Sequence, residues 1–236
     1  MITAFICVIL NLFPLGILIT ILCDIMKILF EDNEIIVCIK PVGILSQEDI
    51  SGKKSMISFL SEHTGGTVFP LHRLDREVGG VMVYAKTKNA AARLSTDIAN
   101  HSFKKEYIAL VHGSPQEPKG EMRDLLFKDS RKNKSFVVKR VRKGVKEALL
   151  EYNVLETFEQ EGEIYSSVKV LLHTGRTHQI RVQFSSRKMP LAGDRKYGGK
   201  DNYKSIALWS YSLEFNHPIS KEKLIFSAEP ENIKIL

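Results

Sequence analysis

The segment FPLHRLDREVGGVMVYAK, residues 69–86, combines a polar loop with an apolar strand signal. Its polar cluster includes His72, Arg73 and Asp75, and a glycine pair and an apolar run typical of a buried strand follow it. Such a loop presents a carboxylate among cations, beside backbone that another group can approach closely. Because Asp also commonly stabilises turns, this segment alone leaves a structural and a catalytic interpretation of Asp75 open.

Around this segment the sequence shows many short strands and few helices. The candidate strands are rich in β-branched and aromatic residues, and Gly, Pro, Asn or Asp separates them. They cover residues 35–39, 81–85, 105–111, 135–141, 148–156, 165–173, 206–213 and 223–228. Most neighbours are joined without an intervening helix, so the sequence predicts an α+β fold with a mixed, mainly antiparallel sheet and a few flanking helices.

Two helices are candidates. One is predicted over residues 88–100, with Thr87 as its N-cap and one apolar face. The other starts near Thr177, where Ile180 and Phe184 have helical spacing. Alternation of apolar residues through the same stretch also fits a strand, so periodicity does not decide between them.

The first 25 residues, MITAFICVILNLFPLGILITILCDI, differ from the rest of the chain because Asp24 is their only charge. The run is long enough to span a bilayer, and membrane contact is expected only if it is a real anchor. A signal peptide fits poorly, since no basic residue precedes the run and no small-x-small cleavage site follows. We favour an extension outside the working protein, with Met26 as the start and residues 26–236 as one catalytic domain.

Cysteine, glycine and histidine spacings favour no cofactor. The three cysteines form neither a disulfide framework nor a C-x-x-C pair, which favours a reducing, cytoplasmic compartment. No glycine pair has the spacing of a phosphate loop or a dinucleotide fingerprint, so no nucleotide cofactor is predicted. His173 and His178 lack the Glu of an H-E-x-x-H motif, so no metal site is predicted.

The net charge of +7 is concentrated in one stretch. Residues 128–146, KDSRKNKSFVVKRVRKGVK, hold nine basic residues and one acidic residue, and we call this stretch the basic ribbon. Its partial alternation predicts a projecting strand pair that contacts a polyanion, although a solvated hairpin without a partner also fits. The candidate phosphate contacts are Lys139, Arg140, Arg142 and Lys143.

A second polar segment, HTGRTHQIRVQF at residues 173–184, gathers Arg176, His178 and Arg181 around a glycine turn. Arginine presents a planar fork of donors that suits phosphate or carboxylate. The segment therefore fits an anion site, and it fits an ion-paired surface loop equally well.

Four motifs occur in a fixed order along the chain. H-R-L-D at 72–75 precedes the glycine pair, and K-E-Y-I-A-L-V at 105–111, T-G-R-T-H-Q-I-R at 174–181 and G-D-R-K-Y-G-G at 193–199 follow. In content and order they resemble the RluA family of pseudouridine synthases, from about Lys27 to the C-terminus. The opening KILFEDNEIIVCIKPVGILS is also similar to that family's first strand and K-P-x-G turn. Relatives often carry an S4 RNA-binding domain ahead of this region, where this chain has only the apolar stretch.

The resemblance implies the pseudouridine synthase fold and an enzyme that isomerises uridines of rRNA or tRNA, as a monomer without a cofactor. It implies that Asp75 is the catalytic aspartate, that Tyr107 stacks on the target base and that Arg181 pairs with the aspartate. By the same resemblance Arg73 enters the RNA stack when the target nucleotide leaves it. The remaining implied RNA-facing residues are His72, Arg176 and His178.

The sequence departs from the family at Val78-Gly79-Gly80, where Thr-Ser-Gly is usual, so a hydroxyl near the active loop is missing. An RNA-binding protein of the same fold without catalysis is therefore the second hypothesis. A glycoside hydrolase fits less well, because it needs two facing carboxylates and only Glu77 is near Asp75 in sequence.

The implied chemistry suits these residue types. Pseudouridine forms when the N1–C1′ bond breaks, the uracil turns and C5 joins C1′, with no net redox change. A carboxylate can act as nucleophile or base, and a neighbouring cation favours its charged form. The sequence leaves both roles open. A uridine inside a helix must first be flipped out, which costs about a few kcal/mol that stacking and an inserted side chain offset.

Overall fold

The computed structural model describes residues 27–49, 52–231 and 233 of the chain. The apolar segment 1–25, with its three alternative interpretations, lies outside the described residues. Within the described residues, no helix is both long enough and apolar enough to cross a membrane.

Eleven strands of the described chain form one sheet. The strand order is β1-β2-β4-β10-β5-β9-β8-β6-β7, with β11 paired to β10 and β3 paired to β4. The pairs are antiparallel except for β4 with β10. The strands are β1 Ile28–Glu31, β2 Ile35–Lys40, β3 Phe69–Pro70, β4 Gly79–Ala85, β5 Lys104–His112, β6 Lys119–Asp129, β7 Lys134–Val138, β8 Val145–Gln160, β9 Glu163–Leu172, β10 Leu208–Asn216 and β11 Lys223–Ser227.

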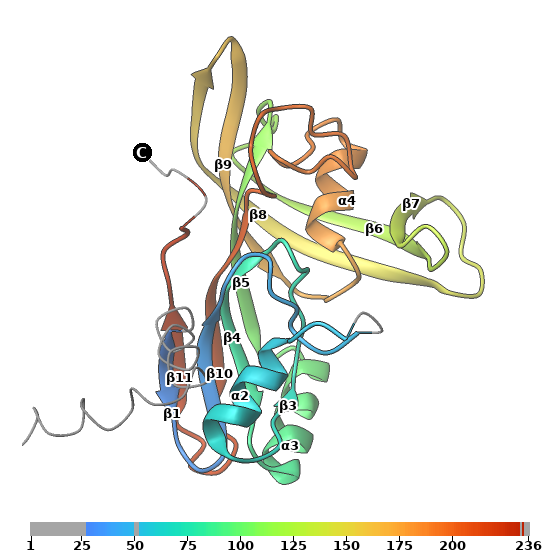
Figure 1. Cartoon of the computed structure of the whole chain (residues 1–236). Helices are drawn as coiled ribbons and strands as arrows, with labels where there is room; N and C mark the ends of the chain where they lie inside the picture. The colour runs from blue at the N-terminus through green and yellow to red at the C-terminus, as the bar shows by residue number, and fades with distance from the viewer. Residues whose placement is uncertain (1–26, 50–51, 232, 234–236) are drawn as a thin grey trace, which may run out of the picture.

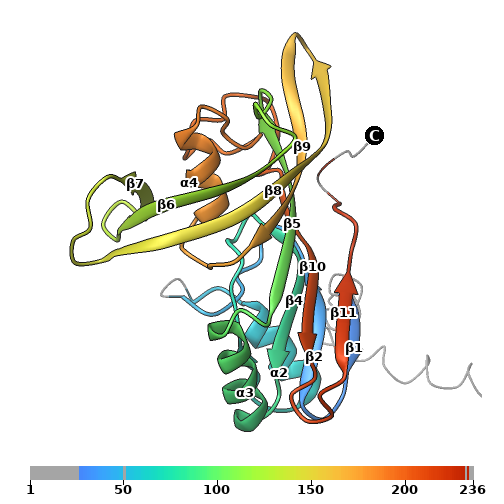
Figure 2. The same cartoon turned by 180° about the vertical axis from the view of Figure 1, so that it is seen from behind.

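Three helices of the described chain cover the two faces of this sheet: α2 Met56–Thr64, α3 Lys88–Ala99 and α4 Gln179–Ser186. Alternate residues of a strand point to opposite faces. Ile36 therefore joins the core beneath α2 and α4, and Ile35 joins the core beneath α3. The predicted α+β fold with a mixed, mainly antiparallel sheet is confirmed. In both views β6, β7 and the start of β8 project sideways beyond α4 (Figures 1 and 2).

The glycine pair lies at the junction between β4 and β10. Gly79 is opposite Trp209 and Gly80 is opposite Ser210 in the parallel pair of strands. A side chain at Gly79 would collide with the Trp209 ring, and one at Gly80, which has φ 118°, would collide with the Ser210 backbone. The departure from Thr-Ser-Gly thus has a local steric cause at Gly79, where the indole occupies the space of a side chain.

The eight predicted strands are present with shifted ends, and the N-cap Thr87 of α3 accepts a hydrogen bond from Ala90 N as predicted. The strand predicted over 135–141 ends at Val138, so the prediction was wrong for the last residues. Residues 139–144 instead form the connection from β7 to β8. The second helix candidate is a helix, α4, and it begins at Gln179. Strands β1, β3 and β6 and helix α2 had not been among the predicted elements.

Candidate active site

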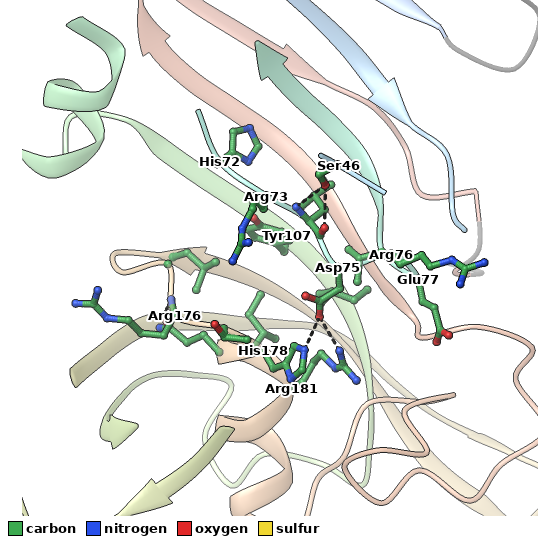
Figure 3. Close-up of a pocket in the computed structure, with 18 of the residues that line it drawn as sticks. Ser46, His72, Arg73, Asp75, Arg76, Glu77, Tyr107, Arg176, His178 and Arg181 are labelled. Atoms are coloured by element: carbon green, nitrogen blue, oxygen red, sulfur yellow. Dashed lines mark hydrogen bonds and ion pairs between the residues drawn. The ribbon is translucent and has the colours of Figure 1, made fainter. Parts of the chain in front are cut away.

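An open pocket of about 1260 Å³ lies between segments that are far apart in the sequence. They include the loop between β3 and β4, the start of β5, the turn from β9 into α4, and the loop after Gly193. Figure 3 shows Asp75 facing His178 and Arg181, while Arg76 and Glu77 of the same loop point away from them. The pocket therefore joins both polar segments found in the sequence.

Asp75 is held by a buried arginine. Arg181 Nη1 donates to Asp75 Oδ2 at 2.6 Å, and its Nε and Nη2 donate to the two carboxylate oxygens of Asp194 at 2.7 and 2.9 Å. Burial alone would lower the pKa of Arg181, but the hydrogen bonds and charges of Asp194 and Asp75 outweigh it and raise that pKa. Asp194 is fully buried, whereas the Asp75 side chain is 31% exposed. A fixed cation thus presents Asp75 to the pocket, and the pairing implied for Arg181 is present.

His178 lies next to this pair as a neutral group. Its Nε2 is 3.8 Å from Asp75 Oδ2, and its Nδ1 is 3.0 Å from the Tyr197 hydroxyl. Burial lowers the pKa of His178 to about 4, although the negative charge of Asp75 opposes this effect. The residue has a left-handed backbone, φ 54°, at the start of α4. It is therefore uncharged at neutral pH and fixed between Asp75 and Tyr197.

Tyr107 lies on β5 and lines the pocket. Its side chain is buried within the main core, with only 5% of the residue exposed. Burial raises the pKa of the Tyr107 phenol well above its usual value, and the charge of Asp75 adds to the effect. Tyr107 consequently presents a neutral aromatic ring beside the carboxylate.

A buried lysine that the sequence analysis did not assign supports the Asp75 loop. Lys40 has no exposed surface, and its Nζ donates to the carbonyls of Pro41, Ile44 and Arg76 at 2.8, 2.6 and 3.2 Å. Burial lowers the pKa of Lys40 to about 7, partly opposed by the charge of Asp75. These bonds tie the K-P-x-G turn to the backbone beside Asp75.

A serine fixes the other side of the same loop. Ser46 Oγ donates to the Leu74 carbonyl at 2.8 Å, and the Leu74 amide donates back to Ser46 Oγ at 3.0 Å. Gly43 and Arg76 also exchange backbone and side-chain hydrogen bonds of 2.8 and 3.0 Å. Residues on both sides of Asp75 are thus anchored to residues 40–46, which orients the carboxylate before any substrate arrives.

The start of β7, which is part of the basic ribbon, contacts the turn before α4 and the loop at Lys196 and Tyr197. The Ser135 amide donates to the Tyr197 hydroxyl at 2.7 Å, and Ser135 Oγ donates to the Thr177 carbonyl at 2.7 Å. Lys134 Nζ donates to the Lys196 carbonyl at 2.6 Å and lies over the Tyr197 ring. The ribbon is therefore joined to the residues that hold Asp75.

The remaining predicted residues divide into two groups. Arg73 and Arg176 line the pocket, and so does His72. The His72 ring is turned into the protein, however, where its Nε2 accepts from Val83 N at 3.4 Å and burial lowers its pKa to about 3. Four residues of the basic ribbon are exposed but do not line the pocket. They are Lys139, Arg140, Arg142 and Lys143.

The two histidines considered as metal ligands have separate protein partners. His173 Nε2 is 2.8 Å from Glu151 Oε1, and the Tyr197 hydroxyl occupies Nδ1 of His178. Each imidazole contacts a different protein group, so the two rings are not arranged as ligands of one metal ion.

Residues 34–186 match the family described as RNA pseudouridylate synthase. The chain belongs to this family. It is thus an isomerase, an RNA pseudouridine synthase, as the sequence motifs implied. Asp75, Tyr107, His178 and Arg181 lie within the matched range, whereas Asp194 and Tyr197 lie beyond it.

Relatives of the synthase extend over most of the chain. An uncharacterized RNA pseudouridine synthase of Aquifex aeolicus is 37% identical over 230 residues, which cover 88% of this chain and 71% of the relative. The ribosomal large subunit pseudouridine synthase D of Borreliella burgdorferi is 33% identical, covering 88% and 66%. The tRNA pseudouridine synthase C of Haemophilus influenzae is 30% identical, covering 86% and 92%.

A solved structure shares the fold of the synthase. Human RNA Pseudouridylate Synthase Domain Containing 1 superposes with a TM-score of 0.73 at 23% identity, over 87% of this chain and 83% of that one. At this identity the likeness establishes the architecture of the sheet and helices, and the roles of individual residues rest on the geometry of the pocket.

Proposed function

We propose that this synthase isomerises specific uridines of rRNA or tRNA, with Asp75 as the catalytic carboxylate. The observation that carries the proposal is the Asp75–Arg181–Asp194 arrangement, in which a buried arginine holds a partly exposed carboxylate at the pocket. The names of the relatives, which include a ribosomal large subunit synthase and a tRNA synthase, support the substrate class.

In the proposed reaction the target uridine leaves its helix and enters the pocket beside Tyr107. Asp75 then acts as nucleophile or base while the N1–C1′ bond breaks. The uracil turns, C5 bonds to C1′, N1 gains a proton and the C5 hydrogen leaves as a proton. Arg181 holds the Asp75 carboxylate in place, because its Nη1 donates to Asp75 Oδ2 at 2.6 Å. Because atoms and electrons balance within the nucleotide, the proposal includes no cofactor.

We assign base flipping and RNA binding to two different sets of basic residues. Arg73 is exposed next to the Asp75 loop and lines the pocket, so we assign it to the gap that the flipped nucleotide leaves. The exposed cations of the basic ribbon are assigned to phosphates beside the target. The proposed active unit is a monomer.

The test of the catalytic assignment is tritium release from RNA labelled with [5-³H]uridine, isolated from cells that lack the gene. Asp75→Asn keeps the size of the side chain and should abolish release. The matched control is Glu77→Gln in the same loop, whose side chain points away from Asp75 (Figure 3) and which should retain activity. Substantial release by Asp75→Asn would refute the assignment. Wild-type protein that binds RNA without releasing tritium would instead favour the non-catalytic hypothesis.

The test of the ribbon assignment is the salt dependence of RNA binding. Each cation that neutralises a phosphate adds about 0.7–0.9 to the slope of log affinity against log salt. Replacing Lys139, Arg140, Arg142 and Lys143 by Gln should lower that slope by about 3 and leave kcat on bound RNA unchanged. An unchanged slope would show that these side chains are a solvated surface.

A further inference from the structure

Lys105 is a buried cation without a partner. It is 7% exposed and lines the pocket, and in the described part of the chain no hydrogen bond or ion pair reaches its Nζ. The adjacent Lys104 has the ordinary arrangement, with 55% of its side chain exposed and its Nζ 3.0 Å from Glu214. The Lys105 ammonium group is therefore open to the pocket but largely withdrawn from water, and an anion that enters the pocket would stabilise its charge.

The charge that affects the pKa of Lys105 is that of a second cation, Arg176. Burial lowers the pKa of Lys105, and the positive charge of Arg176 lowers it further. Arg176 Nε donates to the Glu147 carbonyl at 2.8 Å, and among the described residues no carboxylate pairs with its guanidinium. Two like charges at one wall of a pocket, neither compensated by the protein, form an arrangement that an anion stabilises.

The turn beside Arg176 leaves room for such an anion. A Cβ added to Gly175 would lie 3.6 Å from Lys105 Nζ, so the glycine keeps the ammonium uncovered on this side. The pocket also includes Thr174 and Thr177 of the same turn. The space next to Nζ is therefore bounded by small or hydroxylated residues.

Lys105 lies on the same strand as Tyr107, which places the space next to its Nζ close to the catalytic centre. Lys105 and Tyr107 are two residues apart on one strand, so both side chains project from the same face, roughly 7 Å apart along the strand. A base next to Tyr107 would place the backbone of its own nucleotide within a similar distance. Phosphate is the anion that a flipped nucleotide carries at this distance from its base.

We infer that Lys105 and Arg176 form a seat for a single RNA phosphate, which fixes the backbone of the target nucleotide so that its sugar faces Asp75. This inference rests on the proposed function and adds a binding site to it. It makes Lys105 and Arg176 determinants of nucleotide position, whereas the basic ribbon supplies affinity for the surrounding RNA.

The seat can be tested without RNA. The full chain is labelled with ¹⁵N-lysine, and the Lys105 side-chain resonance, assigned by its loss in Lys105→Met, is followed while inorganic phosphate is added at constant ionic strength. Uridine 5′-monophosphate, uridine 3′-monophosphate and uridine serve as further probes. We expect a saturable shift with phosphate and with at least one nucleotide, and none with uridine. Phosphate affinity should fall at least tenfold in Lys105→Met and stay unchanged in the matched control Lys104→Met.

Methionine keeps the apolar stem of Lys105 packed, and circular dichroism confirms that the variant folds. Lys105→Arg should recover most of the phosphate affinity. Absence of a saturable shift in the wild type, or wild-type phosphate affinity in Lys105→Met, would overturn the seat.

Activity on RNA then separates this inference from the proposed function. Lys105→Met should raise KM for RNA at least tenfold and lower the salt slope of binding by about 0.7–0.9. If phosphate binds through Lys105 but the wild type forms no pseudouridine, the proposed function fails and the seat stands. If Lys105→Met forms pseudouridine with unchanged KM and salt slope, the seat fails and the proposed function stands.

Discussion

Tyr197→Phe tests whether the basic ribbon and the catalytic pocket act as one unit. The Tyr197 hydroxyl accepts from the Ser135 amide and contacts His178 Nδ1. Because the oxygen already accepts one hydrogen bond, its own proton is available for Nδ1, which leaves the Nε2 proton of neutral His178 directed at Asp75. Phenylalanine removes the hydroxyl and keeps the ring, whose centroid is 5.1 Å from the Arg181 guanidinium carbon. The substitution thus isolates the hydrogen bonds from the ring contacts.

The expected loss follows from the burial of these groups. Ser135 is 2% exposed, so its amide loses its acceptor with little access to water. A buried donor without a partner costs about 1–3 kcal/mol. A cost of about 2 kcal/mol lowers Tm by roughly 4–8 °C in a chain of this size. Without the Tyr197 hydroxyl, neither the tautomer nor the orientation of the His178 ring is fixed. This loss should lower kcat by about tenfold, equivalent to about 1.4 kcal/mol of transition-state stabilisation.

Single-turnover tritium release and thermal denaturation measure the two effects separately. RNA affinity should change less than twofold, because no exposed cation is removed. The matched control is Tyr203→Phe. Among the described residues the Tyr203 hydroxyl contacts only Gln160, at 3.5 Å on the surface, so its loss should affect neither measurement. A Tyr197→Phe enzyme with lowered Tm and wild-type kcat would show that the hydroxyl supports the fold alone, and the reasoning about His178 would be refuted.

Two further predictions concern residues that support the site. Gly79→Ser should destabilise the protein by about 1–3 kcal/mol through overpacking against Trp209, and Trp209→Leu should relieve part of that cost in a double-mutant cycle measured by urea denaturation. The pKa of Lys40 falls from 10.5 to about 7, so the folded chain binds fewer protons than the unfolded chain between these values. Wild-type stability should therefore rise relative to Lys40→Met as pH increases from 7 to 10.5, and parallel pH profiles would contradict the assignment.

The sequence predicted the architecture where hydrophobic pattern and local structure agree. Strand β6 was missed because KGEMRDLLFKD contains no β-branched residue, and pairing with both β7 and β8 overrides its weak propensity. Helix α4 was ambiguous for a different reason. Its Ile180 and Phe184 enter the main core, whereas Val182 packs against Tyr197 in a second cluster. A helix buried on two sides shows alternating apolar residues, which periodicity cannot distinguish from a strand.

The sequence predicted only those site residues whose roles were implied by the resemblance of its motifs to the RluA family. The contact of Asp75 with Arg181 spans 106 residues and was implied by two separate motifs. Lys40, Lys105 and Asp194 stood inside quoted motifs without an assigned role, because what distinguishes them is their surroundings. A lysine bonded to three carbonyls and a lysine with no partner look alike in sequence, and burial in the fold separates them.

The dependence of α4 on the β6–β7 hairpin explains why binding and catalytic groups share one unit. An isolated helix of eight residues is not stable in water, and α4 has no side-chain cap at its start. Tertiary contacts stabilise the helix instead. Ser135 donates a hydrogen bond to the turn before the helix. At the other end of the helix, Arg187 pairs with Asp124 of β6 at 2.8 Å. The helix that carries Arg181 is therefore held at both ends by this hairpin, and the connection that follows β7 carries Lys139, Arg140, Arg142 and Lys143. The position of Arg181, and with it the position of the Asp75 carboxylate, therefore depends on contacts between the hairpin and α4 that involve none of these four exposed cations.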